Sequence, residues 1–346
     1  MATPLDPASG PRTPDPGPRC LVFGYHTMGC VGFDALLRHG FEVSAVVTHR
    51  DDPDEQVWWA SLAERARAHG AAVHFPEKAE LKDAAFAALV ASYRPDFVFS
   101  FYFRWMIPSG VLALAPRGAF NLHGSLLPHY RGRAPVNWVL VNGETETGVS
   151  LHRMVAKPDA GDLVDRERVA IEFEDTAYTL YRRLEGAATA LLDRALPALR
   201  DGRAESSPLD LARGSYFSGR RPEDGRFEWS WHARRIYDLV RAVTHPYPGA
   251  FADLAGRRLF VWWATPVVGR VAEPGTVLEV DRNGVTVATG NGALRLVTVQ
   301  LEGEPELPAA AFALANGIAP SQNLVATAPR PPAPGPASAL GNGDPQ

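Results

Sequence analysis

Short apolar runs alternate with longer segments of helical apolar spacing through the first third of the chain. Runs of this length are typical of buried strands, and the segments between them are typical of helices. The pattern predicts strands at residues 20–24, 43–48, 72–75, 97–101 and 120–122, and helices ending near residue 38 and spanning 56–69 and 81–92. Strands separated by helices indicate an α/β fold with a doubly wound, mostly parallel, Rossmann-like sheet.

Beyond residue 123 the pattern changes from this alternation to a hairpin and a long helix. The predicted elements are a helix at 134–141, strands at 148–155 and 163–171, and a helix at 177–196. The two strands are expected to form a hairpin arm that carries Asp159 back toward His123. Apolar residues of the long segment fall on one helical face, which indicates core packing.

The C-terminal part of the chain has a different organisation. Gly, Ser, Pro and charged residues replace the helical pattern at 201–216, which indicates a domain boundary. An amphipathic helix near 236–243 and short strands at 259–263, 275–280, 285–289 and 293–299 are predicted beyond it. Short strands at this spacing favour a small barrel. The predicted organisation is a disordered Pro-rich extension (1–18), an α/β domain (19–206), a β-barrel domain (207–325) and a disordered Pro-rich tail (326–346).

Composition narrows the class of protein. The formal net charge is −4 over 346 residues, whereas nucleic-acid-binding proteins usually carry a basic patch, so nucleic acid is an unexpected partner. Only two cysteines occur, Cys20 and Cys30, and no secretory signal is visible, so we expect a reduced cytoplasmic protein. No apolar run approaches the roughly 18 residues needed to span a bilayer, so membrane insertion is not expected.

Glycines follow the first predicted strand at positions 24, 29 and 32. Their spacing is not the G-x-G-x-x-G of dinucleotide-binding folds, and the lysine of a phosphate-binding loop is missing. A tight strand-to-helix turn accounts for them. His26 lies in this turn and can face a ligand crevice, because such sheets bind ligands beyond the carboxyl ends of their strands.

Asn121 and His123 are two residues apart at the end of a predicted strand, so their side chains share one side of it. An asparagine amide can stabilise the oxyanion of a tetrahedral intermediate, and a histidine can move the proton of an attacking amine. Asp159, with Asp162 in support, can orient the imidazole. An isolated Asn-x-His pair more often has a structural role. The loop at 124–135 that follows is longer than a simple connection requires, which favours a functional role for Asn121 and His123.

Asn121-Leu122-His123, Ser125-Leu126-Leu127-Pro128 and the turn Asp159-Ala160-Gly161-Asp162 resemble the motifs of the folate-dependent formyltransferases, a resemblance that covers about residues 20–324. The run YRGRAPVNWVLVNGETETGV is similar to the formyltransferase domain of the bifunctional polymyxin-resistance proteins, which act on UDP-4-amino-4-deoxy-L-arabinose. The resemblance implies 10-formyltetrahydrofolate as co-substrate, no metal, an OB-like C-terminal barrel, and Asn121, His123 and Asp159 as catalytic residues.

The resemblance also implies binding residues and a backbone feature. Candidates for the folate site are Trp105, Met106, Ile107, Arg133, Val155, Ala156, Lys157, Pro158 and Asp159. Candidates for the acceptor site are His26, Ser125, Tyr130 and Arg131, and Tyr216, Arg241, His245, Pro246 and Pro248 are candidates to close over the substrate. The Leu127-Pro128 peptide bond is expected to be cis.

Three functions compete for this chain. The first is formyl transfer to a nucleotide-linked 4-amino sugar, most directly UDP-4-amino-4-deoxy-L-arabinose, and the second is methionyl-tRNA formyl transfer. Four carboxylates at 51–55 would repel tRNA phosphates, which favours the sugar. The third is a non-catalytic ligand-binding relative. The polymyxin-resistance proteins continue into a decarboxylase domain where this chain has a Pro-rich tail, so another 4-amino sugar is also open as acceptor. The chain can also form a homo-oligomer.

Overall fold

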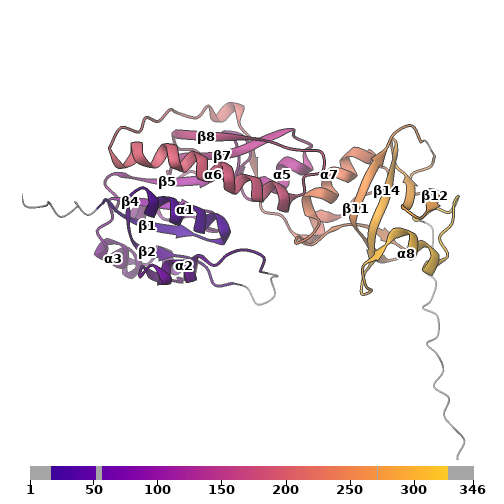
Figure 1. Ribbon diagram of the computed structural model, residues 1–346, viewed down its shortest axis with the longest axis horizontal. Helices are drawn as coiled ribbons and strands as arrows, with labels where there is room; N and C mark the ends of the chain where they lie inside the picture. The colour runs from indigo at the N-terminus through magenta and orange to yellow at the C-terminus, as the bar shows by residue number, and fades with distance from the viewer. Residues whose placement is uncertain (1–16, 52–56, 271, 326–346) are drawn as a thin grey trace, which may run out of the picture. The chain divides into compact units, whose positions relative to one another are not determined.

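The computed structural model describes residues 17–51, 57–270 and 272–325, which form two compact units, Met1–Arg220 and Arg221–Gln346 (Figure 1). Apart from Gly17 and Pro18, the two Pro-rich ends that the sequence predicts as disordered lie outside the described residues. The N-terminal unit contains a seven-stranded sheet, and the C-terminal unit contains a six-stranded one.

The N-terminal sheet has the strand order β3-β2-β1-β4-β5-β7-β8. Its strands are β1 (Arg19–Gly24), β2 (Glu42–Val47), β3 (Ala72–His74), β4 (Phe97–Phe101), β5 (Gly118–His123), β7 (Glu146–Arg153) and β8 (Leu163–Ala170). The first five in this order pair in parallel, and β7 and β8 add an antiparallel hairpin. The predicted mostly parallel sheet and hairpin arm are confirmed.

Helices connect the parallel strands or come after them in the chain, and they lie on both faces of the sheet (Figure 1). They are α1 (His26–Arg38), α2 (Leu62–Ala68), α3 (Ala84–Ser92), α4 (Ser109–Leu112), α5 (Pro135–Val141) and α6 (Ala177–Arg200), with a 3₁₀ turn at Glu80–Lys82. The helix predicted at 56–69 starts only at Leu62, where Ser61 caps it by accepting a hydrogen bond from the Glu64 N–H. Gln56 lies outside the described residues, and residues 57–61 are not helical.

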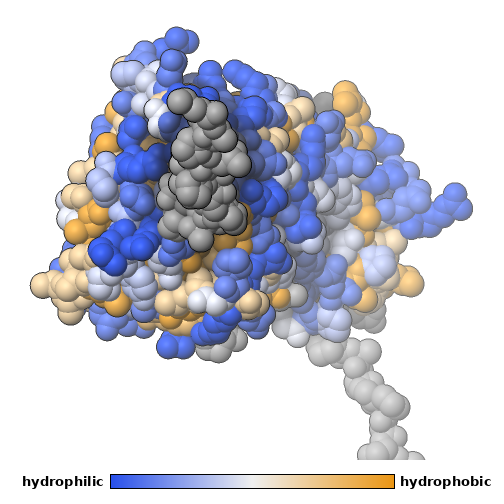
Figure 2. Space-filling view, turned by 60° about the vertical axis from the view of Figure 1, so that its left-hand side comes forward, coloured by the Kyte–Doolittle hydropathy of each residue, from blue (hydrophilic) through white to orange (hydrophobic). Residues whose placement is uncertain are grey.

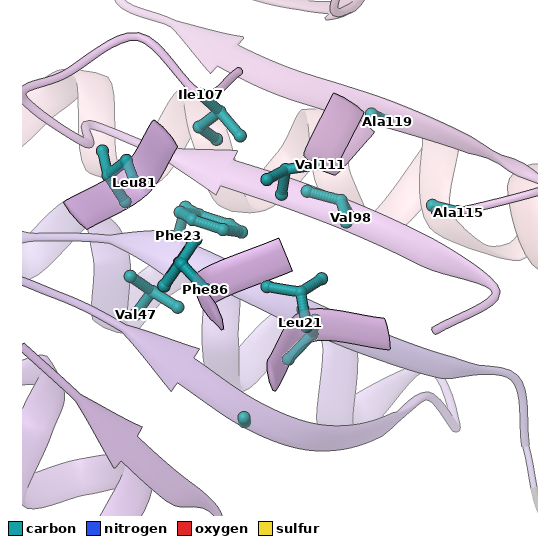
Figure 3. Packing of buried hydrophobic residues seen from close by; sticks show 12 residues of the cluster. Leu21, Phe23, Val47, Leu81, Phe86, Val98, Ile107, Val111, Ala115 and Ala119 are labelled. Carbon is teal, nitrogen blue, oxygen red and sulfur yellow. The ribbon is translucent and has the colours of Figure 1, made fainter. Parts of the chain in front are cut away.

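Alternating side chains of the parallel strands supply two cores. On one face Leu21, Phe23 and Val98 pack against Phe86 of α3 and Val111 of α4, a cluster seen from close by in Figure 3. The rings of Phe23 and Phe86 meet edge to face, with centroids 6.3 Å apart. Burying each such side chain contributes roughly 1.5–3 kcal/mol to the stability of the fold. Packing on the two faces of the sheet therefore fixes the strands that carry the site.

Residues 207–220 belong to the N-terminal unit. The short strand β9 (Tyr216–Phe217) pairs in parallel with β6 (Arg131–Gly132), and Ser207 bridges Leu163 of β8. A 3₁₀ turn at Leu211–Arg213 lies between them. The division at Arg220 therefore comes later in the chain than the predicted boundary at 206, because the segment returns to the loop beyond β5.

The C-terminal unit is an antiparallel β domain. Its sheet order is β10-β11-β14-β13-β12, with β15 paired to β14. The strands are β10 (Ala250–Leu254), β11 (Arg257–Val267), β12 (Val277–Asp281), β13 (Gly284–Ala288), β14 (Ala293–Leu301) and β15 (Leu307–Pro308); α7 (Ala233–Val243), α8 (Ala309–Asn316) and a 3₁₀ turn (Pro222–Gly225) complete it. The sequence pattern missed β10 and α8. Arg241 is buried and pairs with Asp238 at 2.8 Å, so it is a core residue of this unit.

In the part of the chain that the structure describes, no helix is both long and apolar enough to cross a lipid bilayer. On the face shown in Figure 2, hydrophobic residues lie in several small groups between hydrophilic ones.

Candidate active site

A cavity of about 610 Å³ opens at the carboxyl ends of β1, β4 and β5, where a doubly wound sheet binds its ligands. All of its lining residues belong to the N-terminal unit. Most of them lie just after β1 (His26) or β4 (residues 102–107), at the end of β5 (residues 121–124), in the loop at 132–135, or at the end of β7 and in the turn that follows it (residues 152–159). Three separate strands thus supply the walls.

Asn121, His123 and Asp159 meet in this cavity, as the sequence predicts. The Asp159 carboxylate lies 3.7 Å from His123 Nδ1 and 3.5 Å from Asn121 Nδ2. On the other side of its ring, His123 Nε2 lies 2.8 Å from the carbonyl oxygen of Tyr130. A carbonyl can only accept, so this contact places a proton on Nε2 and leaves Nδ1 facing Asp159 and the cavity. The three groups therefore form one polar cluster.

The Asp159 carboxylate is held in its charged form. Burial alone would raise its pKa, but the nearby His123 and His152 and the backbone N–H of Gly132, which donates to Oδ2 at 2.9 Å, outweigh this and hold the pKa well below its usual range. The residue adopts a left-handed conformation, with φ of 48°. Gly161 permits the turn, because a Cβ there would lie 2.0 Å from the carbonyl oxygen of Arg153.

His152 is a buried member of the cluster that the sequence interpretation missed. Its Nε2 lies 3.1 Å from Asn121 Nδ2 and 3.5 Å from Asp159 Oδ1. It stands directly opposite Asn121 in the antiparallel pairing of β5 and β7. A strand register is needed to place it, so the available signal was weak: a histidine inside the first strand of the predicted hairpin.

The loop after β5 supports the site from outside the cavity. Its Leu127-Pro128 bond is cis, which confirms the prediction. Ser125 donates to the carbonyl oxygen of His129 at 2.6 Å, and the Tyr130 hydroxyl donates to Glu144 at 2.5 Å. Ser125, Tyr130 and the buried Arg131 do not line the cavity, although the sequence interpretation placed them in the acceptor site.

Most of the predicted folate-site residues line the cavity. Trp105, Met106, Ile107, Arg133, Val155, Pro158 and Asp159 do so, whereas Ala156 and Lys157 do not. The segment after β4 also contributes Tyr102, Phe103 and Arg104, which the sequence interpretation left out. Tyr216 is the one candidate closing residue in the lining. The cavity therefore combines apolar walls with polar and charged side chains, a mixture that small-molecule sites use to bind and orient a ligand.

An aromatic cluster borders the cavity beside β1. His26 stacks on Trp59 with ring centroids 3.9 Å apart, and the Arg104 guanidinium lies 4.5 Å from the centre of the Tyr25 ring. Burial and the Arg104 charge lower the pKa of His26 to about 3, so its ring is neutral at pH 7. Asp51 accepts hydrogen bonds from Tyr25 and Trp59. The other carboxylates of the acidic run lie outside the described residues.

Among the residues that the structure describes, no group of three His, Cys, Asp or Glu side chains is arranged to hold a metal ion.

Residues 21–196 match the family "Formyl transferase", and residues 220–317 match "Formyl transferase, C-terminal domain". The chain belongs to the formyl transferase family. The first match contains Asn121, His123 and Asp159, and the second contains the sheet of the C-terminal unit. In this formyl transferase, the polar cluster and the cavity thus lie in the N-terminal domain.

Solved structures with similar folds include HypX from Aquifex aeolicus in complex with tetrahydrofolic acid, with 20% identity and a TM-score of 0.59 over 86% of this chain and 47% of HypX. The chain therefore spans about half the length of HypX. An N-formyltransferase from Helicobacter canadensis, in complex with folinic acid and dTDP-3-aminofucose, has 17% identity and a TM-score of 0.61 over 80% of this chain and 98% of its own. WlaRD, a sugar 3N-formyl transferase, has 17% identity and a TM-score of 0.59 over 83% and 98%. At these identities the likeness establishes the fold.

Proposed function

We propose that this formyl transferase moves a formyl group from 10-formyltetrahydrofolate to the amine of a nucleotide-linked 4-amino sugar, with UDP-4-amino-4-deoxy-L-arabinose as the first candidate. The observation that carries the proposal is the meeting of Asn121, His123 and Asp159 in one cavity at the end of β5. HypX binds tetrahydrofolic acid, and the H. canadensis enzyme binds both a folate and a nucleotide sugar, which supports this choice of substrates.

Direct transfer needs only groups that this cavity holds. The neutral amine attacks the formyl carbon and gives a tetrahedral intermediate, whose oxyanion accepts a hydrogen bond from the Asn121 amide. The amine proton passes to Nδ1 of His123 and then to the departing folate nitrogen as its bond to the formyl carbon breaks. The Asp159 carboxylate, 3.7 Å from Nδ1, stabilises the imidazolium between these steps.

The folate is proposed to lie against the segment after β4. Trp105 and Ile107 offer apolar walls for a flat heteroaromatic ring, and Val155 and Pro158 face the cavity from the hairpin turn. Arg133 is exposed and lines the cavity, so its planar guanidinium is available to a carboxylate of the folate tail. Ala156 and Lys157 complete the turn without facing the cavity.

The acceptor is proposed to enter beside β1. His26 lines the cavity as a neutral ring stacked on Trp59, and a neutral imidazole offers one donor and one acceptor to a sugar or base. Arg104 adds a positive charge to the same wall, which suits the diphosphate of a nucleotide sugar. We place the reaction in the cytoplasm, because both cysteines are free thiols.

The deciding experiment is an assay of the purified full chain with 10-formyltetrahydrofolate and a panel of amines. The panel contains UDP-4-amino-4-deoxy-L-arabinose, dTDP-linked 4-amino and 3-amino sugars, and initiator methionyl-tRNA, and mass spectrometry detects the formylated product. We expect transfer to a 4-amino sugar nucleotide. Preference for the tRNA, or no transfer to any amine, would overturn the proposal.

A matched pair of histidine variants tests the mechanism. His123→Ala should lower kcat by about three orders of magnitude with a modest change in KM, because it removes the proton acceptor. His129→Ala, in the same loop, is the control, since His129 is exposed and does not line the cavity. Equal activity of the two variants would show that His123 has no part in catalysis.

A further inference from the structure

We propose that Tyr216 forms a subsite for the sugar ring of the acceptor: its aromatic ring packs against the sugar that carries the attacking amine and thereby selects among amino sugars. The proposal rests on the proposed function and adds a specificity-determining residue outside the catalytic cluster. Tyr216 lines the cavity and is 57% exposed, more than any other Phe, Tyr or Trp residue that the structure describes. A large ring left exposed beside a ligand cavity is a candidate contact for the ligand.

The backbone of β9 is fixed to the loop beyond β5. The Arg131 N–H donates to the carbonyl oxygen of Ser215 at 3.0 Å, and the Arg133 N–H donates to that of Phe217, also at 3.0 Å. Gly132, between these two donors, permits the close approach, because a Cβ there would lie 2.1 Å from the Phe217 carbonyl oxygen. β9 is therefore held in one place against β6.

Alternation along β9 decides which of its side chains faces the cavity. Phe217 stacks on Tyr130 with ring centroids 5.0 Å apart, and the centroid of the Trp138 ring is also 5.0 Å from that of Phe217. Successive side chains of a strand point to opposite sides, so Tyr216 points the other way, toward the cavity that it lines. Because β9 is already ordered, a ligand that packs on this ring immobilises only one side chain, which keeps the entropy cost of binding small.

The ring of Tyr216 lies close to the reacting centre. A Cβ built on Gly132 would be 3.2 Å from Tyr216 Cε2, and the Gly132 N–H donates to Asp159 at 2.9 Å. Asp159 in turn lies 3.7 Å from Nδ1 of His123, which receives the amine proton in the proposed reaction. The amine is bonded directly to a ring carbon of the sugar. We therefore infer that the sugar, and not the nucleotide, is the part of the acceptor that meets Tyr216.

The chemistry of the ring suits a sugar. One face of a pyranose presents C–H groups, and packing them on the flat apolar face of a tyrosine removes apolar surface of both from water. A sugar with a hydroxyl on that face packs poorly, because the hydroxyl would lose water without gaining a hydrogen bond. The folate ring has its own apolar walls in Trp105 and Ile107, which leaves Tyr216 for the acceptor.

Substitutions at Tyr216 test the subsite by their effect on the KM of each substrate. Tyr216→Ala should raise KM for UDP-4-amino-4-deoxy-L-arabinose about tenfold. It should change kcat less than threefold, because the sugar touches the ring before and during the reaction, and KM for 10-formyltetrahydrofolate less than twofold. Tyr216→Phe keeps the aromatic face and should recover most of the loss. An unchanged acceptor KM in Tyr216→Ala, a rise in the folate KM instead, or equal effects of both variants would overturn the proposal.

The control is Phe173→Ala, which removes another exposed aromatic ring from the N-terminal unit. Phe173 is 49% exposed and does not line the cavity. Its KM for the acceptor should stay within twofold of the wild-type value, and melting temperatures should show that all three variants are folded. A rise in acceptor KM equal to that of Tyr216→Ala would mean that the effect does not come from the cavity, and the proposal would fail.

Calorimetry distinguishes the sugar from the nucleotide. Titration of the full chain with UDP-4-amino-4-deoxy-L-arabinose and with UDP alone measures what the sugar adds to binding. Tyr216→Ala should weaken binding of the sugar nucleotide about tenfold and that of UDP less than twofold. Equal weakening of both ligands would place the ring against the nucleotide, and no weakening of either would show that the acceptor does not touch it. Both results would overturn the proposal.

These outcomes are separable from failure of the proposed function. If the wild-type chain formylates no amine in the panel, the proposed function fails, whereas calorimetry still decides whether Tyr216 contacts the sugar. If the wild type is active and Tyr216→Ala keeps the wild-type acceptor KM, only the sugar subsite fails.

Discussion

Asp159 shows how a single side chain can carry two roles through its two oxygens. Oδ2 is held by the Gly132 N–H at 2.9 Å, which fixes the carboxylate, and Oδ1 faces His123, His152 and Asn121. The charge is thus kept at the point where His123 becomes an imidazolium. A variant that keeps the size of the Asp159 side chain but removes its charge tests what the charge contributes to catalysis.

We therefore expect Asp159→Asn to lower kcat by about 10²- to 10⁴-fold with little change in KM, because the amide keeps the size of the side chain and loses its charge. Steady-state kinetics with the best amine acceptor provides the measurement. Asp162→Asn, in the same turn but outside the cavity lining, is the matched control and should retain activity. Near-normal turnover of Asp159→Asn would show that the imidazolium needs no counter-charge.

His49 gives a prediction for stability at acid pH. It is buried, accepts a hydrogen bond from the Arg104 N–H at 3.1 Å and stacks on Phe103, so burial and the Arg104 charge lower its pKa to about 4. Between pH 6.5 and 4 the unfolded chain binds a proton that the folded chain does not, so stability falls as the pH falls through this window.

Removing the titratable ring should flatten this dependence. Between pH 7 and pH 5, we expect the free energy of unfolding of His49→Phe to fall by up to about 2 kcal/mol less than that of the wild type. Urea unfolding of the variant and of the wild type at pH 7 and pH 5 measures these free energies. The same comparison with His129→Ala, at an exposed site, should reproduce the wild-type change. Parallel losses in His49→Phe and the wild type would contradict this origin.

At the residue scale, the sequence predicts those site residues that local spacing defines. Asn121 and His123 are separated by one residue on a strand, and the turn containing Asp159 has its own motif, so the cluster they form could be predicted. His152 could not, because its place opposite Asn121 depends on the register of β7 against β5. Ser125, Tyr130 and Arg131 follow the motif but do not line the cavity.

At the scale of elements, close approach of α1 to the sheet explains one of the glycines after β1. A Cβ on Gly32 would lie 2.4 Å from the ring of Phe101, which is fully buried in β4. The spacing of these glycines therefore reflects helix-on-sheet packing, in keeping with the sequence interpretation that rejected a dinucleotide site. Phe101 immediately precedes the segment that lines the cavity, so this packing also positions the site.

Gly32→Ala should consequently destabilise the protein by about 1–3 kcal/mol, although alanine is the better helix former, because a ring in a packed core cannot give way. Gly110→Ala in α4 is the control, since no atom lies within 4 Å of a Cβ built there. Thermal unfolding of both variants provides the measurement. A stability of Gly32→Ala equal to that of Gly110→Ala would mean that α1 can lift from the sheet at little cost.

The elements themselves were predictable where the hydrophobic period is strong. All five parallel strands and the long helix α6 lie where the apolar pattern places them. The start of α2 was not predictable from the sequence. Trp58 and Trp59 precede Leu62 by four and three residues, a helical spacing, but they pack against Tyr181 and His26 in the aromatic cluster and are not helical. β10 was missed since its pairing with β11 is a tertiary contact that no local period reports.

At the scale of the whole molecule, the chain divides into two compact units, and every residue that lines the cavity belongs to the first. The sequence predicts this division because Gly, Ser, Pro and charged residues replace the helical pattern at residues 201–216. It places the boundary too early, since the pairing of β9 with β6 returns residues 216–217 to the first unit.

A ligand that binds this cavity should stabilise the N-terminal unit selectively. Folinic acid, which the H. canadensis enzyme binds, is a suitable probe. At 100 times its Kd it should add about 2.7 kcal/mol to the stability of the unit that binds it, and slow exchange of the most protected amides there about 100-fold. Hydrogen–deuterium exchange should show this slowing in β4 and β5 and leave β11 and β14 unchanged. Equal slowing in all four strands would mean that the two units unfold as one cooperative body, and no slowing in any strand would mean that the cavity does not bind folates.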